Sequence, residues 1–276
     1  MKKNNSLLLS TPYILWMLAF TLIPLGVVAY YALTDPNTGI FTLENITQLQ
    51  LYLPVLWQSI WYSLISAMIC LLLGYPVAYF IAHQKPLAQK ILYMLVMLPM
   101  CMSFLLRTLA WVGLLQDTGI INNLLGLVGI GPLPLIRTPA AVVLGMVYNY
   151  LPYMILPLYA IIVKIDGRLI EAAEDLGCNS VNVFMRVILP LSMPGILSGI
   201  TMVFVPAVST FVISKLLGGS KLMMIGDVIE TMFVGDGCDY NVGAALSLVL
   251  MVLMLLCMSL MHRVDNGEDE LGGMMT

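Results

Sequence analysis

The sequence predicts an all-α, polytopic membrane protein with six transmembrane helices. Of its 276 residues, 60% are hydrophobic and only 10% are charged, whereas soluble domains carry about 25% charged residues. The mean hydropathy is +0.96, and several uncharged apolar runs reach about 20 residues, the length that an α-helix needs to cross a bilayer. No segment alternates polar and apolar residues as barrel strands do, so helices must pair the backbone groups in lipid.

Six apolar segments are expected to cross the membrane. They lie near residues 12–33, 58–82, 91–111, 140–163, 191–212 and 242–262. Arg107 is the one charged residue in these windows, as expected when a charge at the centre of a span costs about 2.5–3.5 kcal/mol. Lys2 and Lys3 precede the first run, as in a signal peptide. That run is too long for one and no small-residue cleavage site closes it, so we expect a retained span.

Lys and Arg predict the orientation of the chain. With the N-terminus in the cytoplasm, the inner segments hold Lys2, Lys3, Lys85, Lys90, Lys164, Arg168, Arg186 and Arg263. The outer segments hold only Arg137, Lys215 and Lys221. Cytoplasmic loops carry an excess of such residues, so both termini are expected in the cytoplasm. The acidic tail, residues 264–276, is expected to be flexible.

The connection between the fourth and fifth spans, residues 166–190, is called the elbow below. It reads as two short helices joined by a turn. Asp166 can cap the first helix, and Gly177 suits the left-handed residue that ends it. Asn179 or Ser180 would then begin the second helix.

Each helix of the elbow is expected to have one apolar side. These sides comprise Leu169, Ile170, Ala173 and Leu176 in the first helix, and Val181, Phe184, Met185 and Ile188 in the second. Glu171, Glu174 and Asp175 face away, and Pro190 suits the first turn of the next span. A rigid elbow fixed to a membrane helix at each end can transmit force. The alternative is an amphipathic loop that lies on the inner leaflet.

The elbow contains "EAAEDLGCNSVNVFMRVILP", which resembles the EAA signature of type I ABC-importer permeases. The residues in register are Glu171, Ala172, Ala173, Gly177, Leu189 and Pro190. Val187 stands where the signature usually has isoleucine. "LLLGYPVAYFIA", "LPYMILPLYAIIVKID" and "LLGGSKLMMIGDVIE" extend the resemblance over almost the whole chain, to spermidine/putrescine permeases of the PotB/PotH type.

The resemblance implies a fold, a function and a set of partners. It implies a MetI-like permease domain at residues 58–263, after an N-terminal span and outer loop at 1–57. It implies the permease subunit of an ATP-driven polyamine importer, whose elbow couples to the ATPase through the six residues in register. The implied partners are two PotA-type ATPase subunits, a PotC-type second permease and a PotD-type external polyamine-binding protein. Other cargo, such as an anion, a metal or an amino acid, stays open, because the elbow does not contact cargo.

The motifs argue against chemistry in this chain. "GGSK", residues 218–221, lacks the rest of a phosphate-binding loop, so ATP and Mg²⁺ are expected on the partner ATPase. The five cysteines are scattered and form no CxxC pair, so neither a metal site nor a bound cofactor is expected. An ion-coupled secondary transporter needs charged residues deep in the bundle, and only Arg107 is available.

Two groups of residues could contact a cationic cargo. Tyr148, Asn149 and Tyr153 lie near mid-membrane, where aromatic faces can attract ammonium groups by up to about 2 kcal/mol. The alternative is interhelical packing with Asn149 as a polar link. Before the sixth span, Asp227, Glu230, Asp236 and Asp239 could form an acidic mouth that concentrates cations. The alternative is an ordinary solvated loop.

Arg107 has two open interpretations. It lies about 9 Å outward from the centre of its span, at 1.5 Å per residue. Its guanidinium could therefore extend to the outer headgroups. Alternatively, it pairs with Asp117 or Asp239 and holds an outer gate. A pathway for cations disfavours an unpaired arginine, so Arg107 is not expected to bind the cargo.

Overall fold

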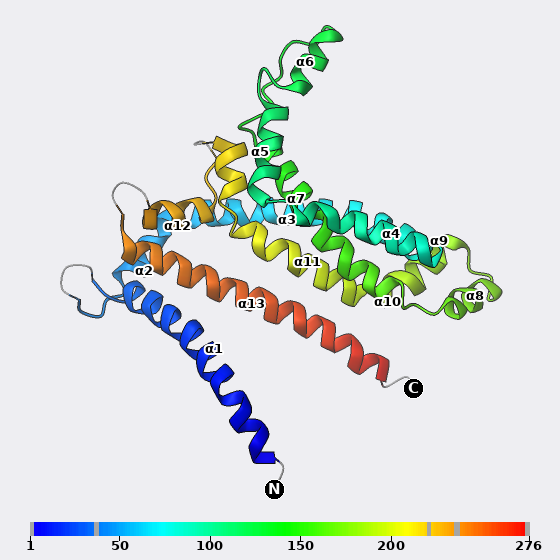
Figure 1. Cartoon of the computed structure of the whole chain (residues 1–276), viewed down its shortest axis with the longest axis horizontal. Coiled ribbons are helices and arrows are strands. Elements are labelled where there is room, and N and C mark those ends of the chain that lie inside the picture. The colour runs from blue at the N-terminus through cyan, green and yellow to red at the C-terminus, as the bar shows by residue number, and fades with distance from the viewer. Residues whose placement is uncertain (1–2, 36–38, 220–221, 235–237, 274–276) are drawn as a thin grey trace. The chain divides into compact units, whose positions relative to one another are not determined.

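The structure is a computed structural model that describes residues 3–35, 39–219, 222–234 and 238–273, with side chains described from Pro12 to Met261 within these ranges (Figure 1). Within them the chain is helical apart from one isolated bridge between Thr34 and Phe41. It divides into two compact units. The first unit comprises Met1–Pro54 and Val228–Leu255, and the second comprises Val55–Asp227 and Leu256–Thr276.

The first unit is held together by buried amide side chains. Its helical segments are α1 (Lys3–Ala32), α2 (Glu44–Gln48), η1 (Leu49–Tyr52), most of α12 (Ile225–Val234) and the first part of α13 (Tyr240–Gly273). The Nδ2 of Asn45 donates to the carbonyls of Ala32 and Thr34 at 3.2 and 2.9 Å. The Nδ2 of Asn241 donates to the carbonyls of Tyr31 and Thr34 at 3.0 and 2.6 Å. These bonds satisfy carbonyls that the end of α1 leaves unpaired.

The second unit contains the elbow. Its helical segments are α3 (Leu53–Ala82), α4 (Pro86–Met97), η2 (Leu98–Cys101), α5 (Phe104–Leu115), α6 (Ile120–Leu127), α7 (Pro139–Ile162), α8 (Gly167–Asp175), α9 (Ser180–Val183), η3 (Phe184–Ile188), α10 (Leu189–Leu191), α11 (Met193–Val208) and η4 (Ser214–Gly218). The segments η3 and η4 are π-helical.

Helix α7 is the centre of the second unit, and α11 packs along it (Figure 1). Small residues allow this close approach. A Cβ atom on Gly195 would lie 3.2 Å from the carbonyl oxygen of Pro157, and one on Gly199 would lie 3.3 Å from that of Met154. Gly74 brings α3 equally close, because a Cβ there would lie 3.1 Å from the Cγ of Met154.

Helix length and hydropathy confirm the all-α polytopic fold. Among the described residues, five segments are long and apolar enough to span a membrane: Pro12–Ala32, Glu44–Ala82, Phe104–Leu127, Pro139–Ile162 and Tyr240–Met261. The pair Ser180–Leu191 and Met193–Val208, bent by 63°, raises the number to six if it is counted as one span.

The expectation of one continuous third span at 91–111 is wrong. Helix α4 ends in the 3₁₀ turn η2, Met102 has extended backbone angles (φ −88°, ψ 148°), and α5 begins only at Phe104. Pro99 explains the break, because it has no N–H to continue the α-helical hydrogen bonds. Helices Pro86–Cys101 and Phe104–Leu127 are therefore separate.

The tail also differs from the expectation. Helix α13 continues to Gly273, so residues 264–273 are helical rather than irregular. An existing helix adds further turns at little cost, because each new residue also adds a hydrogen bond. The last three residues lie outside the described part of the chain.

Candidate functional site

The turns of the elbow are where the sequence places them. The carboxylate of Asp166 accepts a hydrogen bond from the backbone N–H of Arg168 at 3.0 Å and caps α8. Gly177 has φ +84°, and its N–H donates to the carbonyl of Glu174 at 2.8 Å. The Oδ1 of Asn179 accepts from the N–H of Asn182 at 2.8 Å and begins α9. All three predicted end signals are confirmed.

The elbow has a small core of its own. Ala173, Val183 and Ile188 are buried, and the residues packed on them are Tyr79, Ile165, Ile170, Cys178, Phe184 and Val187. Tyr79 comes from α3, so a membrane helix contributes to this core. The elbow is therefore a packed body rather than a loose loop, as force transmission requires.

The predicted apolar sides are only partly correct. Leu169 and Leu176 are 48% and 86% exposed, and Val181 and Met185 are 67% and 55% exposed. In the second helix the reason is η3, in which hydrogen bonds span five residues instead of four. The wider turn brings Val183 into the core and leaves Val181 and Met185 outside.

An apolar strip remains uncovered on α8. It consists of Leu169, Ala172 and Leu176, which are exposed and follow one another at helical spacing. Leu169, Ala172 and Leu176 are called the docking strip below. Exposed apolar groups beside charged ones mark a surface for another protein.

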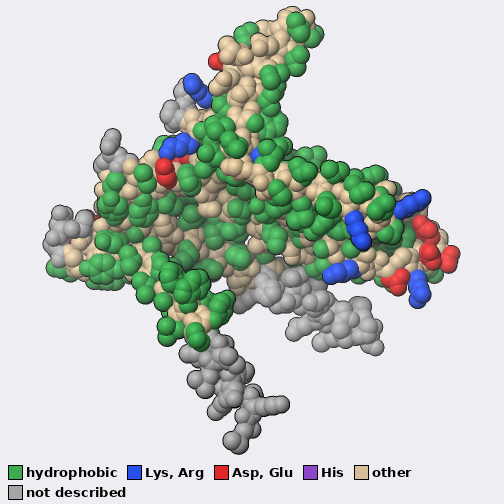
Figure 2. All heavy atoms as spheres, viewed as in Figure 1, with side chains coloured by type: hydrophobic (Ala, Val, Ile, Leu, Met, Phe, Trp, Pro, Cys, Tyr) green, Lys and Arg blue, Asp and Glu red, His purple; other side chains and the backbone are tan. Residues whose placement is uncertain are grey.

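Charged side chains surround the docking strip. Figure 2 shows acidic and basic side chains gathered over α8 to α10, at the right-hand end in this view. The exposed members at and near the elbow are Lys85, Lys90, Lys164, Asp166, Arg168, Glu171, Glu174, Asp175 and Arg186. This end of the second unit is therefore hydrated, while the surface of α4, α5 and α7 is mainly hydrophobic (Figure 2).

The structure distributes the residues of the EAA signature over three roles. Glu171 and Ala172 are exposed on α8, whereas Ala173 is in the core of the elbow. Gly177 forms the turn. Leu189 and Pro190, the last two of the signature, lie in α10, immediately before the 63° bend. Pro190 therefore begins α10 rather than the next span, which starts at α11.

A family model for the "binding-protein-dependent transport system inner membrane component" matches residues 74–268. This match covers the elbow, α7 and α11, and most of the chain. The chain belongs to this family. It is a multi-pass inner membrane component of a binding-protein-dependent transport system, and it is not itself an enzyme.

Curated relatives of this inner membrane component extend over almost its whole length. The spermidine/putrescine transport system permease protein PotB of Haemophilus influenzae is 41% identical over 260 residues, 91% of each chain. PotB of Escherichia coli is 37% identical over 268 residues, 93% of this chain and 97% of the relative.

Solved structures support the fold of this inner membrane component. A chain of a bacterial ABC transporter that imports alginate superposes with a TM-score of 0.78 at 18% identity, covering 95% of this chain and 97% of that one. A chain of the inward-facing MetNI methionine ABC transporter superposes with a TM-score of 0.61 at 16% identity, covering 80% and 97%. The resemblance in fold to known ABC importers is thus direct.

The three α7 residues proposed to contact cargo do not form one group. Tyr148 and Tyr153 are 39% and 36% exposed, but five residues place them about 140° apart around a helix with 3.6 residues per turn. Asn149 is fully buried, so its expected place on a pathway surface is a correction. Its Nδ2 donates to the carbonyl of Gly145 at 2.9 Å and to the Oγ1 of Thr108 at 3.4 Å. Asn149 therefore links α7 to α5.

Trp111 was missing from the sequence-based set. Its ring lies 5.4 Å from that of Tyr148, nearly edge to face at 73°. Trp111 is on α5, and its pairing with α7 crosses two helices that are distant in sequence. The only signal in the sequence is an aromatic residue at the end of an expected span, which is common at membrane interfaces.

The acidic residues before α13 also have structural roles. Asp227 is buried, and its Oδ2 accepts from the N–H of Met224 at 2.7 Å, so it caps α12 rather than facing a mouth. The Oδ1 of Asp239 accepts from the N–H of Val242 at 3.1 Å and caps α13. Glu230 and Asp239 are half-buried. Asp236 and Lys221 lie outside the described residues.

Arg107 fits neither interpretation from the sequence. It is only 5% exposed, so its side chain does not extend to the headgroups. Its Nε and Nη1 have no hydrogen-bond partner among the described residues. Asp117 instead lines a cavity of about 760 Å³ together with Arg137 and Lys215. Arg107 lies beside Tyr150, whose side chain also bonds to Thr210.

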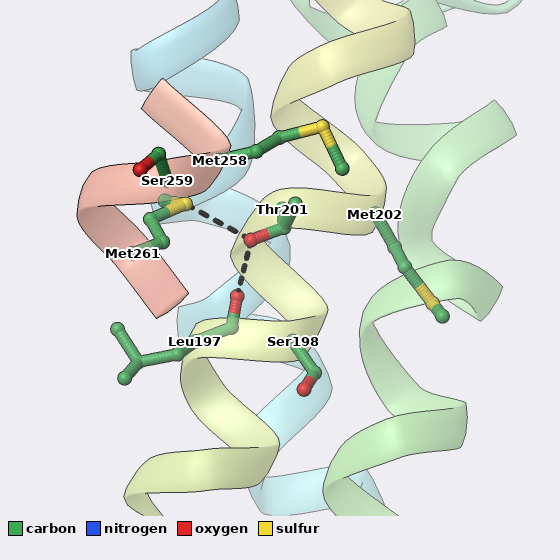
Figure 3. A pocket seen from close by; sticks show the side chains of 7 residues that line it. All are labelled: Leu197, Ser198, Thr201, Met202, Met258, Ser259 and Met261. Atoms are coloured by element: carbon green, nitrogen blue, oxygen red, sulfur yellow. Dashed lines mark hydrogen bonds between the residues drawn. The ribbon is translucent and has the colours of Figure 1, made fainter. Parts of the chain in front are cut away.

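A second cavity, of about 660 Å³, lies between α11 and the described end of α13 (Figure 3). Leu197, Ser198, Thr201, Met202, Met258, Ser259 and Met261 line it. The Oγ1 of Thr201 donates to the carbonyl of Leu197 at 2.8 Å and lies 2.9 Å from the Sδ of Met261. None of these seven residues is acidic or aromatic, so the lining does not suit a polycation.

Proposed function

We propose that this chain is the permease subunit of an ATP-driven ABC importer that moves polyamines, spermidine and putrescine, into the cell. The observation that carries the proposal is the identity of 41% and 37% to two PotB permeases over more than nine-tenths of the chain. Such identity extends through the elbow and all the long helices. The permease would form one half of the pathway across the membrane.

The proposed complex contains two PotA-type ATPase subunits, a PotC-type second permease and a PotD-type external polyamine-binding protein. ATP and Mg²⁺ would be used by the ATPase subunits. The elbow would face the cytoplasm with both termini, which the charges around α8 to α10 support. There the docking strip would contact an ATPase subunit.

We propose that coupling uses the six residues of the EAA signature. Glu171 and Ala172, on the exposed face of α8, would contact the ATPase. Gly177 would fix the angle between the two helices of the elbow. Leu189 and Pro190 would pass the movement to α11 across the bend.

The transport cycle follows from the two ends of the elbow. ATP binding would draw the ATPase subunits together and move the elbow, which is continuous with α7 on one side and with α11 on the other. Both helices would tilt as a pair, because Gly195 and Gly199 hold them in contact. The pathway would then open outward and receive a polyamine from the binding protein. ATP hydrolysis would reset it.

Reconstitution of the complex in liposomes tests the cargo. Labelled spermidine should enter only with ATP and the binding protein, and unlabelled putrescine should compete while phosphate and thiosulfate should not. Entry of an anion, a metal or an amino acid instead of spermidine would assign another ABC cargo. Uptake that persists without the ATPase subunits, driven by an ion gradient, would overturn the importer mechanism.

A cation needs aromatic or acidic contacts, and Tyr148 with Trp111 is the best-placed described pair. Tyr148→Leu is expected to raise the spermidine concentration for half-maximal uptake by about 2- to 30-fold, because it removes a cation–π contact worth about 0.5–2 kcal/mol. Tyr13→Leu, at an exposed tyrosine of α1, should leave that concentration unchanged. Initial uptake rates over a range of spermidine concentrations measure both. An equal effect in the two variants would exclude the pair, whereas Tyr153, Glu230 and Asp239 would remain candidates.

A further inference from the structure

The bend between the elbow and α11 is held by a residue of a third helix. Ser192 lies at the bend of 63° and is fully buried. Its N–H donates to the carbonyls of Ile188 and Leu189 at 3.0 and 3.2 Å. Pro190 and Pro194, on either side of it, have no N–H, so the backbone alone leaves the bend weakly restrained.

Tyr75 of α3 supplies an additional restraint. Its hydroxyl lies 2.8 Å from the Oγ of Ser192. The Ser192 hydroxyl donates its single proton to the carbonyl of Leu189 at 2.9 Å. The Tyr75 hydroxyl therefore donates to Ser192, and both groups are satisfied in a buried place where a lost partner is costly.

Tyr75 also contacts the elbow before the bend. Its ring lies 5.5 Å from that of Phe184, edge to face at 84°. Tyr79, one turn further along α3, lies 6.2 Å from the same ring. Phe184 begins η3, so Tyr75 touches the segment on one side of the bend and the residue at its centre.

Helix α3 is in turn fixed to the central helix. Gly74, next to Tyr75, allows α3 to approach Met154 of α7 closely. A movement of the elbow therefore reaches α7 and α11 through the chain and reaches α3 through Tyr75. The contacts form one connected set within the second unit.

We infer that Tyr75 and Ser192 are positioning residues for coupling: their hydrogen bond fixes the bend so that a movement of the elbow tilts α3 together with α7 and α11. The inference rests on the proposed function, in which the elbow is moved by an ATPase. Neither residue belongs to the EAA signature. Without the bond the elbow would flex at Ser192, and ATP would be hydrolysed with less cargo moved.

The test measures cargo moved for each ATP hydrolysed, with the whole complex in liposomes. Tyr75→Phe keeps the ring contact with Phe184 and removes only the donor. It is expected to lower this ratio by about three- to tenfold, the effect of one hydrogen bond. Ser192→Ala should lower the ratio as much, and the double variant should be no worse than either single one. Ser192→Thr, which keeps a hydroxyl, should restore the ratio.

Tyr79→Phe is the matched control. Tyr79 contacts Phe184 in the same way, but its hydroxyl makes no hydrogen bond among the described residues. It should leave the ratio unchanged. An unchanged ratio in Tyr75→Phe would overturn the inference. So would a parallel fall of uptake, ATP hydrolysis and yield of assembled complex in both Tyr75→Phe and Ser192→Ala, because that pattern indicates a folding role.

The proposed cargo is tested separately by the wild-type complex. If the wild type moves another solute instead of spermidine, the polyamine assignment fails, and the same ratio measured with that solute still tests the hydrogen bond. If the wild type moves spermidine and only the variants behave like it, the cargo stands and the positioning role fails.

Discussion

Leu176→Asp is expected to abolish uptake while the chain still inserts into the membrane and assembles with the second permease. Leu176 is 86% exposed at the end of α8, so the change breaks no internal packing. In the proposed complex the docking strip is buried against the ATPase, and an unpaired charge in such a contact costs about 2–5 kcal/mol. Binding of the ATPase should weaken by about 30-fold or more.

Retention of the ATPase during purification and uptake in liposomes measure this effect. Leu127→Asp is the matched control, because Leu127 is 83% exposed at the end of α6, outside the elbow. Glu171→Lys, on the exposed face of α8, is expected to act like Leu176→Asp by reversing a charge in the same contact. Normal uptake in both elbow variants would show that α8 is not the docking surface.

Gly177→Val is expected to reduce uptake at least tenfold with little loss of the assembled complex. Gly177 has φ +84°, a conformation that costs other residues about 1–2 kcal/mol and β-branched residues more. No atom lies within 4 Å of where its Cβ would be, so the effect comes from backbone strain and not from a clash. Relief of the strain would change the angle between α8 and α9.

Two further substitutions isolate this cause. Gly177→Asn should keep most of the uptake, because asparagine tolerates the left-handed region. Gly167→Val is the matched control, since Gly167 has equal space and no positive φ. Uptake in liposomes at equal amounts of complex is the measurement. Similar losses in the Gly177→Val and Gly167→Val variants would mean that the turn is not what matters.

Signals that act within a few residues predicted the structure well. Asp166, Gly177 and Asn179 each bond to backbone two or three residues away, so the sequence around them contains all that decides the turn. Hydropathy predicted the long helices for a similar reason, since each must pair its own backbone groups in lipid.

Features that depend on a distant part of the chain were not predictable. Asn149 is buried because Thr108 meets it from α5, and Trp111 faces Tyr148 across the same contact. Asp227 looked like an exposed acid, but it caps its own helix from a buried position. A sequence window shows the type of these side chains and not which helix packs beside them.

The π-helical segment η3 has a consequence for which length changes the chain can tolerate. A π turn holds one more residue than an α turn, so η3 is equivalent to a single-residue insertion. Deleting one residue between Phe184 and Ile188 would regularise the segment and rotate everything after it by about 100°. Gly195 and Gly199 would then point away from α7. The elbow and the helix that follows it are locked in phase, and homologues with one residue more or fewer at this point must compensate elsewhere.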